Sequence, residues 1–232
     1  MDIPIHIELA ERVDLFKNTL GFEGLGDDHI KEIAALAFAK RFAKGDSIFY
    51  QDEPCEFLHV VAQGLVKVSI CSFSGSRITY LLADRGEPLN LVGPFTGSPR
   101  FISAEALEET VVMHVNREDF LSFAIKNPVV IVNIVSILGA AIDSANGRII
   151  DMIEKPVEQR LLKVLYTLYE KFGHTLKFTG TELAELAGTT TESTLRAMAR
   201  LRKRGIITSS RGEVIIVKPA KLKHLSDDTL WV

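Results

Sequence analysis

The chain has 232 residues, of which 47% are hydrophobic and 25% are charged, and its formal net charge is −3. These values suit a soluble globular protein with one large domain or two ordinary ones. The two cysteines, Cys55 and Cys71, are too few for a secreted disulfide framework or a four-cysteine metal cluster. We therefore expect reduced thiols in a cytoplasm.

The sequence offers no clear targeting or membrane segment. Its first residues carry acids and no positively charged stretch before an apolar core, so they do not resemble a signal peptide. The most apolar run, residues 128–142, is interrupted by Asn133, Ser136 and Gly139 and is too short to span a membrane. We expect a cytoplasmic protein without a membrane partner.

The first part of the chain predicts one short helix, at residues 27–39, followed by many short strands. Glycine-punctuated β-type runs are typical of a sandwich or a jelly-roll barrel. Gly64 stands where a hairpin would turn, and the alternation from Val66 to Ile70 indicates a half-buried strand. The β-type runs are residues 42–53, 57–70, 77–92 and 101–115.

A helical segment starts at residues 117–124, and a long helix is predicted from Pro128 to about Glu154. Its apolar residues lie on more than one face. One face can pack on the barrel, and a second copy of the same helix is the simplest partner for the other. The alternative is a helix buried within one monomer.

Pro156 marks the best domain boundary, because proline disfavours helical geometry before it and suits the first turn of a new helix. That next helix is predicted at residues 157–172. We predict an α+β protein with three parts: a sensor β-barrel domain with N-terminal helices (1–127), a dimerisation helix and hinge (128–155), and a winged helix-turn-helix DNA-binding domain (156–232).

Residues 179–207 predict a helix-turn-helix, with helices at 181–187 and 190–204 around Gly188. The segment after it, residues 205–217, predicts a two-stranded wing whose tip holds Arg211, within reach of a phosphate. The predicted buried residues are Leu183, Leu186 and Ala187 on the first helix and Leu195, Met198 and Leu201 on the second. The predicted exposed residues are Glu192, Arg196, Arg200 and Lys203.

Charge supports DNA binding by this part of the chain. Between Thr189 and His224 there are nine Lys or Arg residues and only two acids, in a chain with a net charge of −3. Basic side chains gathered on one element are the electrostatic footprint of phosphate binding. The alternative is an ordinary solvated helix pair.

This order of parts resembles the cyclic-AMP receptor / fumarate-nitrate regulator family of bacterial transcription factors, from about Phe42 to Val217. The most specific match is TTTESTLRAMARLRKRGII, in which Glu192, Ser193 and Arg196 follow the pattern of the family's recognition helix. The resemblance implies a homodimer on a palindromic operator in double-stranded DNA, with RNA polymerase as a candidate partner. Glutamate can accept from cytosine, and arginine can donate to guanine O6 and N7.

The resemblance also implies further DNA contacts, and helix capping is an equal alternative for Thr179 and Thr181. Two positions depart from the family's patterns: Thr191 stands where cyclic-AMP receptors have Arg, and Leu195 where fumarate-nitrate regulators have Ser. The predicted DNA-binding residues are Glu192, Arg196, Thr191, Ser193, Thr190, Thr179, Thr181, Arg200 and Arg211.

The cyclic-nucleotide site of the family is not matched. The Arg-Ser-Ala triplet reads Ile102-Ser103-Ala104, the Gly-Glu pair is missing from residues 89–93, and Ala145 and Asn146 replace the adenine-binding hydroxyls. A buried phosphate needs a cation, and Arg100 is the only substitute nearby. We therefore expect no response to cyclic AMP. The cysteine cluster of the oxygen-sensing members is absent too.

Two kinds of sensor remain open, and the cofactor is unknown. One binds an apolar or aromatic effector; the other binds haem and detects carbon monoxide or nitric oxide. None of the six histidines has a distinguishing local pattern, and a surface histidine is the default. The predicted effector pocket comprises Tyr80, Leu91, Arg100, Phe101, Ile102, Ser103, Ile142 and Asn146.

Two other classes of protein are alternatives. A cupin-type metalloenzyme would need clustered ligands such as His-x-His with Glu, whereas His59 and His114 stand singly. A module that has lost DNA binding would not need Glu192 and Arg196. No Ser/His/Asp constellation or phosphate-binding glycine loop suggests catalysis, so we expect a regulator without enzymatic activity and without a metal site.

Overall fold

The computed structural model describes residues 3–73 and 75–226 and divides into two compact units. Unit 1 is Met1–Gly75 with Leu81–Ala140, and unit 2 is Ser76–Tyr80 with Ala141–Val232. The dividing point lies within the long helix α5 (Pro128–Glu154), so the predicted boundaries after residues 127 and 155 remain predictions.

The N-terminal half contains two four-stranded sheets. Ring contacts between Phe49 of one sheet and His59 of the other, with centroids 5.2 Å apart, join their inner faces. The result is a jelly-roll-like sandwich; the described sheets do not close into the predicted barrel. The first sheet has the order β1 (Ile3–Ile5), β2 (Phe38–Phe42), β8 (Thr110–Asn116), β4 (Phe57–Gln63), and the second has the order β3 (Ser47–Phe49), β7 (Ser103–Ala106), β5 (Val66–Cys71), β6 (Arg77–Ala83).

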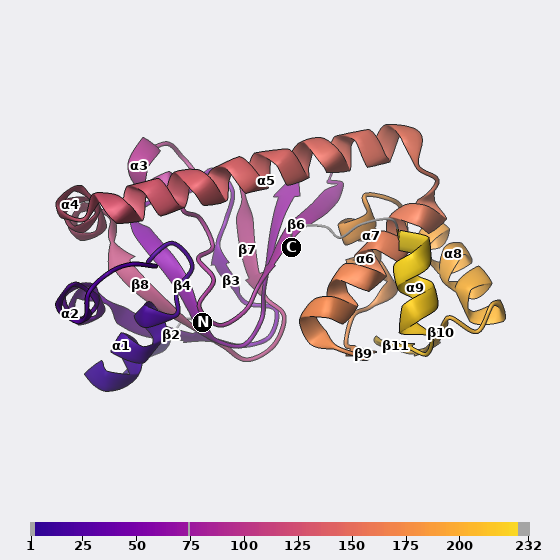
Figure 1. Ribbon diagram of the computed structural model, residues 1–232, viewed down its shortest axis with the longest axis horizontal. Coiled ribbons are helices and arrows are strands. Elements are labelled where there is room, and N and C mark those ends of the chain that lie inside the picture. Colours follow the sequence, from indigo (N-terminus) through magenta and orange to yellow (C-terminus); the bar gives the residue numbers. More distant parts are fainter. Residues whose placement is uncertain (1–2, 74, 227–232) are drawn as a thin grey trace. The chain divides into compact units, whose positions relative to one another are not determined.

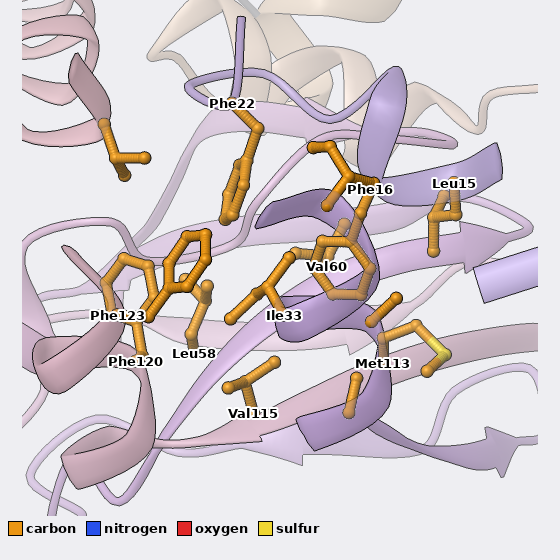
Figure 2. Packing of buried hydrophobic residues seen from close by; sticks show 14 of the residues in the cluster. Leu15, Phe16, Phe22, Ile33, Leu58, Val60, Met113, Val115, Phe120 and Phe123 are labelled. Carbon is orange, nitrogen blue, oxygen red and sulfur yellow. The ribbon is translucent and has the colours of Figure 1, made fainter. Parts of the chain in front are cut away.

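Helices cover the outer face of the first sheet (Figure 1). They are α1 (Leu9–Lys17), α2 (Asp27–Leu36) and α4 (Arg117–Lys126); the short α3 (Gly93–Thr96) precedes α4. Figure 2 shows their aromatic side chains meeting aliphatic side chains of β4 and β8. The cluster is built around residues that are each 1% exposed or less: Phe16, Phe22, Ile33, Leu58, Val60, Met113, Val115, Phe120 and Phe123.

Two predicted strands and one predicted helix of this domain need correction. The chain turns at Gly64 from one sheet into the other, so β4 and β5 are not a hairpin. The turn requires glycine because its φ is +89° and a Cβ would lie 2.6 Å from the Glu109 carbonyl. Strand β5 is buried on both faces, since Lys67 is 5% exposed and reaches Glu105 at 3.6 Å. The helix predicted at 27–39 ends at Leu36, where β2 follows.

Helix α5 carries many exposed apolar side chains. By length and composition it is the one helix among residues 3–73 and 75–226 that could cross a membrane, with 11% of its most apolar window buried. An exposed apolar helix face is also what a helix-mediated dimer needs. The exposed large residues are Val129, Val132, Val135, Ile142, Ile149, Ile150 and Ile153.

The second unit has the winged helix-turn-helix arrangement that was predicted. Helix α6 (Val157–Phe172) has the predicted bounds, and β10 (Ile207–Ser210) pairs with β11 (Glu213–Ile216) as the wing. The remaining elements are β9 (Thr175–Leu176), α7 (Gly180–Ala187), α8 (Thr191–Lys203) and α9 (Pro219–Ser226).

One face of α8 was predicted wrongly. Leu195 is 51% exposed, while Thr194, Ala197, Met198 and Leu201 form the buried side. The apolar stripe is therefore anchored on the small residues Thr194 and Ala197, because a helix that packs closely needs small side chains at the contact.

Candidate nucleic-acid interface and effector site

The turn between α7 and α8 is fixed by caps at both helices. Thr179 and Glu182 form a capping box: the Glu182 N–H donates to Thr179 Oγ1 at 3.2 Å, and the Thr179 N–H donates to Glu182 Oε2 at 2.6 Å. Gly188 ends α7 in the left-handed conformation with φ +61°. Thr190 caps α8 by accepting from the Ser193 N–H at 3.2 Å. The first turn of α8 is therefore held in place.

The first two turns of α8 present the two predicted base-reading residues together. Arg196 Nη1 lies 3.0 Å from Glu192 Oε1, and the side chains are 63% and 78% exposed. Arg196 Nη2 also donates to Ser193 Oγ at 3.3 Å. An exposed i,i+4 ion pair contributes only about 0.3–0.5 kcal/mol, so it can open at little cost when both partners meet other groups.

The predicted phosphate contacts gather beside this pair. Thr191 Oγ1 donates to Thr181 Oγ1 at 3.4 Å, which brings the N-terminal ends of α7 and α8 together. Helix N-termini favour anions through their free N–H groups. Arg211 is exposed at the turn of the wing, between β10 and β11. Binding of phosphate by these residues remains a prediction.

Arg200 differs from the other predicted DNA-binding residues. Its Nε donates to Glu158 Oε2 from α6, and Arg204 Nη1 lies 2.7 Å from Glu158 Oε1. The side chain is thus bound to the domain's own scaffold. Its contribution to DNA binding stays a prediction, and we expect it to be smaller than that of Arg196.

A buried charged cluster at the C-terminal end of α5 was not predicted. Asp151 Oδ2 accepts from Lys163 Nζ at 2.9 Å, and Lys155 Nζ lies 3.1 Å from Asp151 Oδ1. Burial acts to raise the pKa of Asp151, but the hydrogen bonds and charges of Lys163 and Lys155 outweigh it, so the pKa is lowered. The sequence signal for this cluster is that Arg148 and Asp151 interrupt the apolar residues near the C-terminal end of α5.

Arg160 and Arg148 hold backbone carbonyls near the helix-turn-helix. Arg160 donates to the Lys155 carbonyl at 2.9 Å and to the Ala187 carbonyl at 3.0 Å. Arg148 Nη2 donates to the Leu186 carbonyl at 2.8 Å, and a cavity of about 20 Å³ lies beside Arg148 and Asp151. That volume suits one water molecule. Hydrogen bonds from these arginine side chains to backbone carbonyls therefore hold the end of the predicted hinge, at Lys155, against α7.

A different arrangement occupies the interior of the jelly-roll domain. The guanidinium of Arg100 lies 4.1 Å from the centroid of the Phe49 ring, and the side chain is 4% exposed. His59 and His114 are buried next to each other, with ring centroids 4.7 Å apart. Burial, followed by the charges of His114, Arg100 and Lys40, lowers the pKa of His59 well below its ordinary value.

The predicted pocket residues are spread over both units. In unit 1, Leu91 and Ile102 are buried at 8% exposure and Ser103 Oγ accepts from the Gln51 N–H at 2.9 Å, whereas Phe101 is 71% exposed. We leave Phe101 out of the proposed contacts for that reason. Tyr80, Ile142 and Asn146 belong to unit 2, and burial raises the pKa of Tyr80 to about 12.

His59 and His114 do not flank a haem. Their rings are in contact, with centroids 4.7 Å apart, and phenylalanine rings pack against them, so no macrocycle lies between the two imidazoles. Within residues 3–73 and 75–226, no group of three or more His, Cys, Asp or Glu side chains could hold a metal ion. The cupin alternative thus gains no support from the described residues.

Comparisons with known proteins agree with this architecture. Residues 39–127 match the cyclic nucleotide-binding domain, and residues 159–225 match the Crp-like helix-turn-helix domain. The chain is 27% identical over 207 residues to the cyclic AMP receptor protein of Thermus thermophilus, which covers 88% of this chain and 95% of that protein.

Two solved structures show the same fold. FixK2 from Bradyrhizobium japonicum has a TM-score of 0.73 at 20% identity and covers 84% of this chain and 99% of its own. The c-di-GMP responsive global regulator CLP from Xanthomonas campestris has a TM-score of 0.75 at 16% identity, over 83% of this chain and all of its own.

A cyclic nucleotide-binding-like domain, a long helix and a Crp-like helix-turn-helix in one chain define an effector-controlled transcription regulator that binds DNA. The chain belongs to the CRP/FNR family of bacterial transcription regulators.

Proposed function

We propose that the protein binds a two-fold symmetric operator as a homodimer, reads its bases with Glu192 and Arg196, and is controlled by an effector in the jelly-roll domain. The observation that carries the proposal is the exposed pair of Glu192 and Arg196, one turn apart on the capped end of α8. Membership of the family supports DNA binding and dimerisation.

Base reading follows from the chemistry of that pair. In DNA, Glu192 accepts from a cytosine amino group and Arg196 donates to guanine O6 and N7, each contact contributing about 1–3 kcal/mol of discrimination. Thr179, Thr181 and Ser193 place hydroxyl groups for phosphates beside these bases, together with Arg211 on the wing. Thr190 and Thr191 orient the end of the helix.

Selection of DNA from a random pool tests the proposal. We expect an inverted repeat with half-sites about 34 Å apart, one helical turn, because a two-fold protein places its recognition helices at that spacing. Affinity for the selected DNA should fall as salt concentration rises, since phosphate contacts release counterions. Recovery of unrelated sequences without a shared motif would contradict sequence-specific binding.

The dimer is proposed to form through the exposed apolar face of α5. Replacing both Ile149 and Ile153, which are 57% and 79% exposed, with Asp should yield a monomer in sedimentation experiments and reduce operator affinity at least about 100-fold. Ile125→Asp is the matched control: this isoleucine is 71% exposed on α4, and we expect the variant to remain dimeric. A dimeric double variant would place the interface elsewhere.

Control by the effector is proposed as a population shift between DNA-competent and incompetent arrangements. We expect no heat of binding when cyclic AMP is titrated into the protein, because the family's phosphate-binding arginine is Ile102 here, 8% exposed and uncharged. A saturable calorimetric signal would overturn this expectation.

Further aspects of the proposal rest on the family alone. As a bacterial transcription regulator the protein would act in the cytoplasm, have no enzymatic activity and meet RNA polymerase at its promoters. A haem-dependent gas sensor is the alternative: an absorption spectrum taken before and after adding haem should lack a saturable Soret band if the effector is a small organic molecule.

A further inference from the structure

We propose that the interior of the jelly-roll domain is an anion site, in which Arg100 and His59 hold the carboxylate of a small monoanionic effector. The inference rests on the proposed function for its regulatory consequence, because it names the class of molecule that would control DNA binding. The site itself lies within unit 1 and can be tested without DNA.

Arg100 is held in place, but two of its guanidinium nitrogens have no hydrogen-bond partner among the described residues. Its backbone is fixed from both sides: the Arg100 N–H donates to the Glu53 carbonyl at 2.9 Å, and the Asp52 N–H donates to the Arg100 carbonyl at 2.7 Å. The guanidinium stacks on Phe49. In the part of the chain that the structure describes, its buried Nε and Nη1 have no hydrogen-bond partner, and the charges of Glu53 and Glu56 act on the guanidinium without a hydrogen bond to either nitrogen.

Such an arrangement is costly without a ligand. A buried charge normally has a paired carboxylate and satisfied N–H groups, because desolvation is not otherwise repaid. The protein follows that rule at Lys67, which is 5% exposed and lies 3.6 Å from Glu105 in the same domain. The buried Arg148 of unit 2 has no carboxylate, but its Nη2 donates to the carbonyls of Thr79 and Leu186. Arg100 has neither kind of partner among the described residues, and this contrast points to an anion that is supplied from outside the chain.

His59 provides a second, independent unpaired group against the same ring. Its imidazole lies 5.2 Å from the Phe49 centroid, is 3% exposed, and has a buried Nδ1 with no partner among residues 3–73 and 75–226. A neutral imidazole can donate one N–H to an anion. Its neighbour His114 already places Nδ1 at 3.1 Å from the Val112 carbonyl, so it serves the backbone and not the ligand.

The surroundings indicate the charge and the body of the ligand. One unpaired guanidinium balances one negative charge, which favours a carboxylate over a phosphate dianion. The rings of Phe42, Phe49 and Phe57 near the histidines favour an apolar or aromatic body. A surface depression of about 340 Å³ beside Phe49 is lined by Asp46 and Glu53, so its acids disfavour an anion there.

Thermal unfolding of the full-length protein tests the site. The probes are sodium benzoate, sodium acetate and inorganic phosphate, compared with sodium chloride at the same ionic strength. Benzoate should raise the unfolding midpoint by at least several degrees at saturation, because a ligand that binds only the folded state stabilises it. Acetate should act more weakly, and neutral benzamide should have no effect. An effect of phosphate larger than that of benzoate would overturn the carboxylate assignment.

Variants separate an anion site from a structural role. Arg100→Met keeps the apolar stem and removes the charge, so without added anion it should unfold at the same temperature as the wild type or higher, and it should not respond to benzoate. His59→Phe should raise the benzoate concentration that gives the half-maximal shift in unfolding midpoint about tenfold, because one hydrogen bond to a charged group is lost. Arg41→Met, an exposed arginine of β2 that faces Glu109, is the matched control and should respond like the wild type.

Each outcome decides the matter. The proposal is overturned if Arg100→Met responds to benzoate as the wild type does, if it unfolds many degrees lower without anion, or if no probe exceeds sodium chloride. Failure of the proposed function would look different, because selection of DNA would then yield no shared motif while the benzoate response of the jelly-roll domain remained.

Discussion

The DNA-binding unit and the interior of the jelly-roll domain treat buried charge in opposite ways. At the end of α5 the buried carboxylate has counter-charges within the chain: Asp151 meets both Lys163 and Lys155 at 2.9 and 3.1 Å. The neighbouring Arg148 donates its Nη2 to the carbonyls of Thr79 and Leu186. In the jelly-roll interior, Arg100 and His59 have buried nitrogens without a hydrogen-bond partner among the described residues. The first arrangement is complete as the chain folds, whereas the second is complete only with an added group.

This difference matches what each region must do. A recognition helix must present Glu192 and Arg196 in one geometry, so its caps and supporting charges are satisfied internally. A sensor must differ in free energy between its free and bound states, and unpaired buried donors provide that difference because a ligand removes their desolvation cost.

The largest effect is expected where the complete arrangement is broken. Lys163→Met should destabilise unit 2 by about 3 kcal/mol, because it leaves the buried Asp151 carboxylate with only the partly exposed Lys155. Urea unfolding measures the change. Lys155→Met is the control and should cost less, since its side chain is 25% exposed. If both substitutions lowered the free energy of unfolding equally, the deeper burial of Lys163 would not make its ion pair with Asp151 the more important one.

Removing the base-reading arginine should have an intermediate effect. Arg196→Ala should weaken binding to the selected operator by about 1–3 kcal/mol while leaving weak, salt-sensitive binding to unrelated DNA intact, because only a base contact is lost. Fluorescence anisotropy with both DNAs measures this. Arg200→Ala should affect the two DNAs alike and by less, since Arg200 is engaged by Glu158. Unchanged operator affinity in Arg196→Ala would refute the base-reading assignment.

Much of the fold could be predicted because its signals are local. Pro156 and the apolar periodicity fixed α6, and Gly188 with Thr190 marked the turn before α8. The pairing of strands into sheets could not be predicted. A glycine turn such as that at Gly64 can join two strands of one sheet or strands of two different sheets, and the local sequence does not distinguish these cases. The buried face of α8 was predicted wrongly because Leu195, as a large apolar residue, suggested a core position. In the structure Thr194 occupies the core position, because the helix packs closely there.

The two candidate sites differ in the same way. The DNA-binding residues lie within one helix-turn-helix, so spacing along the chain was enough to group them. The proposed anion site draws Phe49, His59 and Arg100 from β3, β4 and the loop before β7. Their meeting depends on how two sheets pack, for which the sequence contains no periodic signal. Arg100 was noticed for its charge, whereas His59 was passed over because isolated histidines carry no pattern.

The smallest expected effect is a change of folding stability with pH, which occurs in different pH ranges for His59 of the jelly-roll domain and Asp151 of the DNA-binding unit. Burial, followed by the charges of His114, Arg100 and Lys40, lowers the pKa of His59, and only the backbone of Phe57 acts in the opposite direction. The unfolded chain therefore takes up a proton on His59 below about pH 6.5 that the folded chain does not, and stability falls as pH decreases, by at most about 1.4 kcal/mol per pH unit. Asp151 acts in a lower range: because its pKa is lowered, its contribution is kept until pH falls below the ordinary carboxylate value of about 3.9.

Urea unfolding at pH 7.5 and pH 5.5 tests this separation. The wild type should lose stability over that interval, and His59→Phe should lose less, because the titrating group has been removed while an aromatic ring still fills the space. His29→Gln, at an exposed histidine of α2, should behave as the wild type does. If His59→Phe kept the full loss, the acid sensitivity would belong to other groups. If benzoate removed the loss in the wild type but not in Arg100→Met, the same imidazole would be both the weak point of the empty domain and a contact of the bound one.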